Sequence, residues 1–179
     1  MRYDMLVAAY HEAGHAVMAL ECNFSIAQIA VITPSTGYVT MRQSHVPYLH
    51  CQTGSQAVVS PVERLHCILK RIYVLLAGPA AEYEVRKLPH YGPGTAYFVD
   101  HDMINEILAQ AHVRELFDKH VPQGLLGLQG EVETWVMDSR VWERIEVLAD
   151  ALLQEHRLDW DAIEAWLVIA GQRQQMSLF

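Results

Sequence analysis

The sequence predicts a mainly α-helical domain of the α+β class, with about five helices and a small β-sheet beside the first helix. Helix-forming residues dominate both the first twenty positions and the last third of the chain. Between them the β-branched run IAQIAVI, turn residues and then GYVTM predict two short strands. A length of 179 residues, 51% hydrophobic and 19% charged, suits one folded domain spanning residues 1–179.

The first predicted helix runs from Asp4 to about Cys22. Apolar residues lie on nearly every side of this helix, so we expect it to be buried. Gly14 in its middle costs roughly 1 kcal/mol relative to alanine, which indicates that another element packs closely against the backbone there. The two strands follow, with turn residues from Pro34 to Gly37 between them. Residues 43–60 show neither the periodicity of a helix nor that of a strand, and we expect them to form a long loop.

A second helix is predicted to begin at SPVE, residues 60–63. Ser60 can cap it, Pro61 suits the first helical position, and Glu63 can complete a capping box. We expect this helix to continue through LHCILKRIYVLLAGPAAEYEV, with a kink near Gly78-Pro79 because proline lacks the backbone donor.

The remaining elements are also predicted to be helical. Residues 88–98 form a connection rich in glycine and proline, and a helix follows from about Val99 to Lys119. HVPQGLLGLQG is expected to be a second loop. Apolar residues then recur at helical spacing, and Asp159 can cap a final helix that ends near Ala170.

Composition excludes several classes of protein. A net charge of −8 provides no basic surface for nucleic acid or for an anionic membrane. The three cysteines, Cys22, Cys51 and Cys67, form no C-x-x-C pair, which argues against a cysteine zinc site and suits a reducing compartment. Asp4 interrupts any signal peptide, and the apolar run IYVLLAGPAA is far shorter than the ~20 residues of a spanning helix. We therefore expect a soluble, cytoplasmic protein that is not inserted in a membrane.

The stretch HEAGH contains the strongest chemical signal. Residues four apart on an α-helix project side by side, so His11 and His15 can bind one Zn²⁺ ion together. In the zincin arrangement the intervening glutamate, here Glu12, is the general base for a zinc-activated water. The alternative is a helix with two incidental histidines, and the surrounding alanines argue against it because buried histidines without a partner are costly.

Zinc needs a third protein ligand, and the residue pattern leaves this ligand open. Glu21 lies six residues beyond His15, which makes simultaneous ligation awkward. DHD at residues 100–102 is the densest later cluster of ligand-type residues. The candidates after the first helix are His45, His50, Glu82, His90, Asp100, His101 and Asp102.

Five segments resemble the zinc peptidase domain of FtsH-type AAA proteases, in order and over nearly the whole chain. HEAGHAV resembles the family's metal-binding motif, and IAQIAVITPSTGYVTM resembles its strand, turn and following strand. LLAGPAAEYEV is similar to its Leu-Gly-Gly-Arg-Ala-Ala-Glu-Glu helix. GPGTAYFVDHDMINEILAQA looks like its Thr-Gly-Ala-x-x-Asp-Leu stretch, and VWERIEVLADALLQEHRLDWDAIEAWL looks like its closing helices.

The resemblance implies a helical zincin-like fold and a specific set of site residues. Carried over by position, the zinc ligands are His11, His15 and Asp102, with Glu12 as general base. Asp102 is preferred to Asp100 because it precedes the apolar residues Met103 and Ile104. A substrate-binding edge strand would comprise Gly37, Tyr38, Val39, Thr40 and Met41 and would hold an extended peptide by backbone hydrogen bonds. Glu82 would support the zinc ligands from behind, although a surface salt bridge is an equal alternative for it.

The chain also departs from the family. It contains no G-x-x-x-x-G-K-[ST] phosphate loop, Gly-Pro replaces Gly-Arg at 78–79, and the glycine-rich loop differs around residues 97–100. The expected function is a zinc metallopeptidase that cleaves flexible or unfolded polypeptides, without ATP-driven unfolding of its own. A homo-oligomer or an ATPase on a separate chain is an expected partner. The alternatives are a zinc-containing, non-proteolytic binding or regulatory module and a protease that cuts one cytoplasmic regulator.

Overall fold

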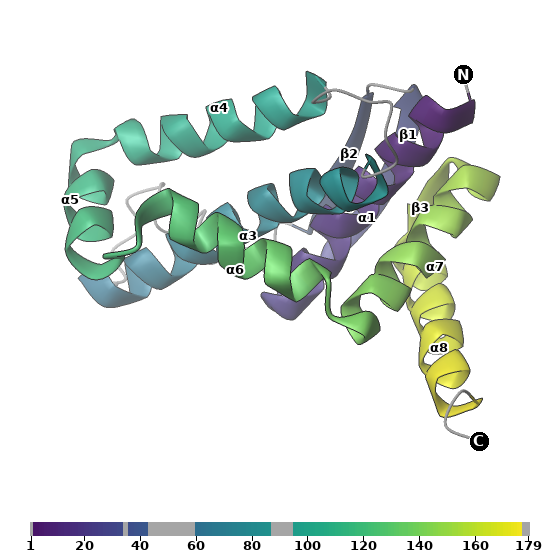
Figure 1. Ribbon diagram of the computed structural model, residues 1–179. Coiled ribbons are helices and arrows are strands. Elements are labelled where there is room, and N and C mark those ends of the chain that lie inside the picture. Colours follow the sequence, from purple (N-terminus) through teal and green to yellow (C-terminus); the bar gives the residue numbers. More distant parts are fainter. Residues whose placement is uncertain (1, 34–35, 43–59, 87–94, 177–179) are drawn as a thin grey trace.

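The computed structural model describes residues 2–33, 36–42, 60–86 and 95–176. Within these ranges the chain is mainly helical with a small β-sheet, as the sequence predicts. The sheet has three antiparallel strands, one more than the two that the sequence predicts. Helix α1 (Arg2–Glu21) lies at the centre of this arrangement (Figure 1). It packs against α3 (Pro61–Arg86), α7 (Ser139–Glu155) and the strand β1 (Ile26–Thr33).

The sheet has the order β2-β1-β3, so β1 is central among the described strands. Strand β2 (Thr36–Met41) pairs with β1 through registers such as Ile29 with Val39. The short strand β3 (Arg157–Asp159) pairs with the other side of β1, placing Leu158 opposite Ile29. Strand β2 also contacts α1, so an edge of the sheet lies beside the HEAGH helix.

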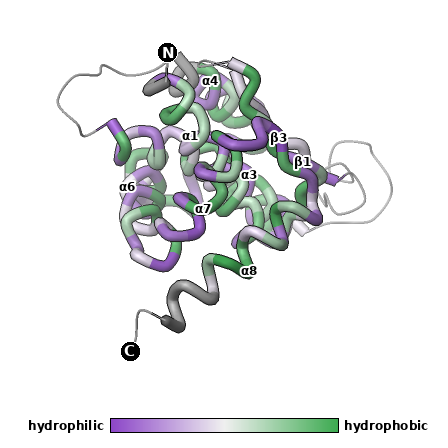
Figure 2. Tube along the Cα trace, turned by 90° about the vertical axis from the view of Figure 1, so that its right-hand side faces the viewer, coloured by the Kyte–Doolittle hydropathy of each residue, from purple (hydrophilic) through white to green (hydrophobic). Residues whose placement is uncertain are grey.

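Four further helices complete the described part of the chain. They are α4 (Thr95–Ala109), α5 (Ala111–His120), α6 (Gly124–Val136) and α8 (Trp160–Met176). In both Figure 1 and Figure 2, α8 extends away from the other helices towards the C-terminus. No helix within the described ranges is long and apolar enough to cross a membrane.

Several predictions of helix boundaries are wrong. Helix α4 begins at Thr95 rather than near Val99, and α8 continues to Met176 rather than ending near Ala170. The helix expected from Val99 to Lys119 is two helices that meet at Gln110, whose extended backbone precedes α5. The segment HVPQGLLGLQG is not a loop throughout, because α6 begins at Gly124. Its Leu128 and Val132 are buried, and this tertiary burial outweighs the low helix propensity of the glycines.

The predicted start of α3 is confirmed. The backbone N–H of Ser60 donates to Glu63 Oε2 at 2.8 Å, and the N–H of Glu63 donates to Ser60 Oγ at 3.2 Å. These reciprocal hydrogen bonds form the capping box. The helix then continues through Gly78 and Pro79 to Arg86. Asp159 likewise caps α8, by accepting a hydrogen bond from the N–H of Ala162 at 3.0 Å.

The close packing expected at Gly14 is present between α1 and α3. A Cβ atom at this position would lie 2.6 Å from the carbonyl oxygen of Ala77 and 2.8 Å from the Cβ of Ala81. Both distances are shorter than van der Waals contact allows, so only glycine fits without a shift of the helices. This close approach brings the HEAGH motif against the face of α3 that contains Gly78 and Glu82.

Candidate metal centre

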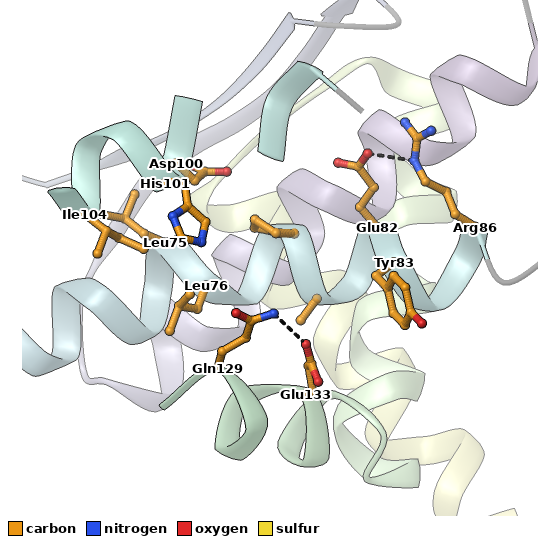
Figure 3. A pocket seen from close by; sticks show the side chains of 12 residues that line it. Leu75, Leu76, Glu82, Tyr83, Arg86, Asp100, His101, Ile104, Gln129 and Glu133 are labelled. Atoms are coloured by element: carbon orange, nitrogen blue, oxygen red, sulfur yellow. Dashed lines mark hydrogen bonds and ion pairs between the residues drawn. The ribbon is translucent and has the colours of Figure 1, made fainter. Parts of the chain in front are cut away.

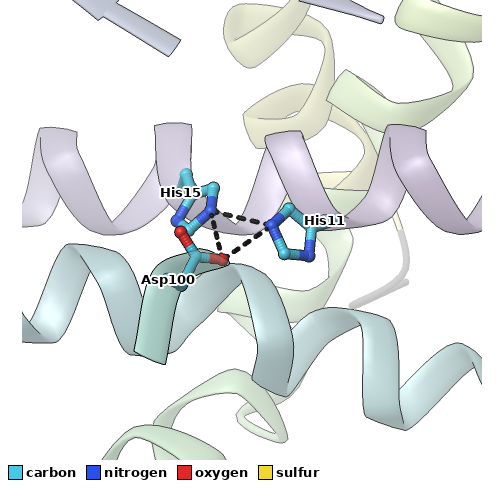
Figure 4. Close-up of side chains that lie close together, drawn as sticks. All are labelled: His11, His15 and Asp100. Atoms are coloured by element: carbon cyan, nitrogen blue, oxygen red, sulfur yellow. Dashed lines mark hydrogen bonds and ion pairs between the residues drawn. The ribbon is translucent and has the colours of Figure 1, made fainter. Parts of the chain in front are cut away.

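Two histidines and one aspartate converge between α1 and α4 (Figure 4). His11 and His15 come from α1, with their Nε2 atoms 2.9 Å apart. Asp100 comes from α4, and its Oδ2 lies 3.0 Å from His11 Nε2 and 3.4 Å from His15 Nε2. All three residues are buried. They form a group of ligand-type atoms that could hold a metal ion.

The Nδ1 atom of each histidine donates a hydrogen bond to an oxygen atom of α3. His11 Nδ1 donates to Glu82 Oε2 at 2.9 Å, and His15 Nδ1 donates to the carbonyl oxygen of Val74 at 2.7 Å. A carboxylate and a carbonyl can only accept, so each Nδ1 carries the proton in a neutral imidazole. Each Nε2 then presents a lone pair to the interior of the site.

When both imidazoles are neutral, three acceptor atoms face one another, the two Nε2 atoms and Asp100 Oδ2. Asp100 Oδ2 is buried and has no hydrogen bond of good geometry within the described residues. Such an arrangement is unfavourable unless a cation lies among the three atoms. Two imidazoles and one carboxylate are a set of metal ligands found in catalytic zinc sites.

The spacing of these atoms also fits zinc. Ligand atoms at 2.0–2.2 Å from a tetrahedral ion lie about 3.3–3.6 Å from one another. The separation of 3.4 Å lies within this range, and those of 2.9 and 3.0 Å are a few tenths of an ångström shorter than its lower limit. A small movement of the side chains would thus complete a three-ligand site without rearranging the helices.

The electrostatics of the site reflect the same convergence. Burial lowers the pKa of His11, but the neighbouring carboxylates of Asp100 and Glu82 outweigh burial and raise the pKa to about 9. Burial raises the pKa of Asp100, but the two histidines outweigh it and hold the pKa well below its usual range. Without a metal, a proton on His11 is therefore the cation that compensates the carboxylate.

Glu12 is buried beside this group and faces the edge strand. A Cβ atom on Gly37 of β2 would lie 2.5 Å from Glu12 Cγ and Oε1, so the glycine lets the strand approach the carboxylate closely. Burial raises the pKa of Glu12, and the positive charges of His15 and His11 oppose this in part. A raised pKa makes the carboxylate a better proton acceptor near neutral pH.

Contacts on α3 fix the orientation of both histidines. Glu82 binds His11 through one oxygen and Arg86 Nε through the other, at 2.7 Å. Gly78 lies directly against the ring of His15, where any side chain would overlap the imidazole. The sequence left a supporting position and a surface salt bridge open for Glu82, and in the structure this residue is buried and contacts both His11 and Arg86.

The structure brings Asp100, rather than Asp102, to the two histidines. Asp102 is exposed on α4 and does not belong to the cluster. The periodicity of α4 provides the reason: Asp100 shares its face with the buried residues Ile104 and Ile107, four and seven positions later. This helical spacing was the signal that would have identified Asp100 from the sequence.

The other candidates lie elsewhere. Glu21 is exposed at the end of α1 and forms an ion pair with Arg144. His101 lines a neighbouring pocket, whereas His45, His50 and His90 lie outside the described residues. The predicted substrate-binding residues Gly37, Tyr38, Val39 and Thr40 belong to β2 at the edge of the described sheet, where the Tyr38 hydroxyl accepts a hydrogen bond from Gln28.

A scan against protein-family models finds no match, and a search of curated proteins finds none either. The resemblance to FtsH-type peptidases therefore rests on the motifs in the sequence.

Proposed function

We propose that this chain is a zinc-dependent metallopeptidase with a helical zincin-like domain that cleaves flexible or unfolded polypeptides. The observation that supports this proposal most strongly is the convergence of His11, His15 and Asp100, whose Nε2 and Oδ2 atoms lie within 3.4 Å of one another. A zinc ion bound there would supply Lewis acidity, lowering the pKa of water towards ~7 and polarising a peptide carbonyl.

The roles of the protein groups follow from their positions. Glu12 accepts the proton of the attacking water and delivers it to the departing amine. Glu82 and the carbonyl of Val74 keep the His11 and His15 rings oriented with their lone pairs inward. The edge of β2 next to Glu12 can hold an extended peptide through backbone hydrogen bonds. The proposal includes a cytoplasmic location and, as partner, either a further copy of this chain in a homo-oligomer or a separate ATPase.

A second candidate is a zinc-containing, non-proteolytic binding or regulatory module. The low exposure of the site favours it, since His11, His15, Asp100 and Glu12 are all between 4% and 7% exposed. The number of ligands favours the enzyme, because structural zinc sites have four protein ligands and catalytic sites have three. Within the described residues the cluster contains three.

Cleavage of a dye-labelled unfolded protein by the zinc-loaded chain distinguishes the two candidates. We expect Glu12→Gln to keep stoichiometric zinc and to lose activity by about 100-fold or more, because it lacks the proton acceptor. Glu21→Gln, on the same helix but in an exposed ion pair, is the matched control and should retain activity. Equal cleavage by wild type and Glu12→Gln would contradict the assigned base, and bound zinc without any cleavage would support the binding module.

A further inference from the structure

A pocket of about 470 Å³ lies between α3, α4 and α6, next to the candidate metal centre (Figure 3). Asp100 and Glu82 belong to both sites. Asp100 contacts the two histidines, Glu82 orients His11, and both residues line the pocket. A peptide held at the metal centre could therefore place one side chain in this pocket.

The body of the pocket is apolar. Leu75, Leu76, Pro79 and Ala80 of α3 form one wall, and Ile104 of α4 contributes to another. Gln129 and Glu133 of α6 form the polar end that faces α3 (Figure 3). Apolar pockets with a few polar groups are typical binding sites, in which the polar groups determine specificity.

Negative charges outnumber positive charges in the lining of the pocket. The carboxylates are those of Glu82, Asp100 and Glu133, and the guanidinium is that of Arg86. Glu82 is paired with Arg86, and Asp100 is paired with the histidines. Glu133 Oε1 accepts a hydrogen bond from the neutral amide of Gln129 at 2.9 Å. Within the described ranges no cation is paired with Glu133. This half-buried carboxylate therefore has the capacity to bind a cation from a ligand.

We propose that this pocket is a substrate subsite that selects a long side chain ending in a cation, lysine or arginine. The methylene groups would lie against Leu76 and Ile104, and the cationic end would pair with Glu133. Both residues have this combination of an apolar stem and a charged end. The inference rests on the proposed peptidase activity, and it adds a class of substrate side chain to that activity.

Mapping cleavage sites in a mixture of unfolded peptides tests the subsite. We expect lysine or arginine to be enriched at one fixed position relative to the cleaved bond. Replacing that lysine by norleucine should lower kcat/KM about fivefold, as for a partly exposed ion pair. Glu133→Gln should abolish the difference, and Glu133→Lys should favour glutamate instead. Glu131→Gln is the control, since Glu131 lies on the same helix but bonds to Tyr73, outside the pocket.

Two outcomes separate failure of the subsite from failure of the proposed function. Glu12-dependent cleavage without a positional preference, or with one that Glu133→Gln leaves unchanged, would overturn the subsite alone. If no cleavage occurs, binding of the lysine and norleucine peptides to the zinc-loaded Glu12→Gln chain is compared by fluorescence polarisation. If the lysine peptide binds about fivefold more tightly than the norleucine peptide, and this difference depends on Glu133, the subsite is supported. Equal binding of the two peptides overturns it.

Discussion

Replacing Asp100 by asparagine should weaken zinc binding, whereas the same change at Asp102 should not. The two aspartates lie two residues apart on α4, but only Asp100 is buried and within 3.4 Å of both histidines. Asparagine preserves the size of the side chain and removes its charge. The pair of variants therefore separates loss of a ligand from a general effect on α4.

The size of the effect can be estimated from linkage. Loss of a group that only orients a metal ligand costs up to about 100-fold in affinity, so loss of the ligand itself should cost at least that much. At a free zinc concentration 100 times the wild-type Kd, zinc stabilises the folded chain by about 2.7 kcal/mol. After a 100-fold loss of affinity the same zinc stabilises it by only about 0.4 kcal/mol.

The difference of about 2.3 kcal/mol corresponds to about 5–9 °C in Tm for a chain of this size. The assay is the zinc-induced rise in Tm, measured for each variant against its own metal-free sample. Wild type and Asp102→Asn should show the full rise, and Asp100→Asn should lose most of it. A full zinc-induced rise in Tm for Asp100→Asn would refute Asp100 as the third ligand. Loss of this rise in Asp102→Asn alone would support Asp102, the ligand that the resemblance implies.

Three further predictions concern packing, pH and the support of the ligands. Gly14→Ala should destabilise the chain by about 1–3 kcal/mol in urea unfolding, because a Cβ would overlap the backbone of α3. Gly130→Ala, where nothing lies within 4 Å, should instead stabilise by up to about 1 kcal/mol, and equal effects would contradict the packing. In metal-free protein the raised pKa of His11 stabilises the fold fully below pH 6.5 and loses this effect as pH rises through about 9. The lowered pKa of Asp100 stabilises above its ordinary value of 3.8 and loses this effect in more acidic solution. Tm with a chelator should therefore fall from pH 6.5 towards pH 10, and a flat profile that Asp100→Asn does not alter would contradict this pairing. Glu82→Gln should weaken zinc binding by about 10–100-fold in a competitive chelator titration, and unchanged affinity would show that Glu82 does not support His11.

Local signals with a defined geometry were predictable from the sequence. The capping box of Ser60 and Glu63 needs only the spacing of two residues, and both of its hydrogen bonds are present. The mid-helix glycine at position 14 indicated a close neighbour, and the neighbour is α3. The two strands were also indicated by composition and period, whereas residues 34–35 of the predicted turn lie outside the described ranges.

Features that depend on tertiary contacts were not predictable in this way. The sequence of α6 contains three glycines and resembles a loop, yet burial of Leu128 and Val132 makes it helical. Strand β3 has three residues, which is too short for any period to be visible. The resemblance points to Asp102 by position, whereas the helical period of α4 places Asp100 on the buried face with Ile104 and Ile107.

The most direct test of the proposed centre is the position of zinc in crystals of the zinc-loaded chain, located by anomalous scattering at the zinc edge. We expect one strong peak within about 2.2 Å of the Nε2 atoms of His11 and His15 and of an Asp100 carboxylate oxygen. A fourth position open to solvent beside Glu12 would support hydrolysis. A peak at Asp102, or none at the histidines of a chain that binds zinc stoichiometrically, would contradict the proposed site.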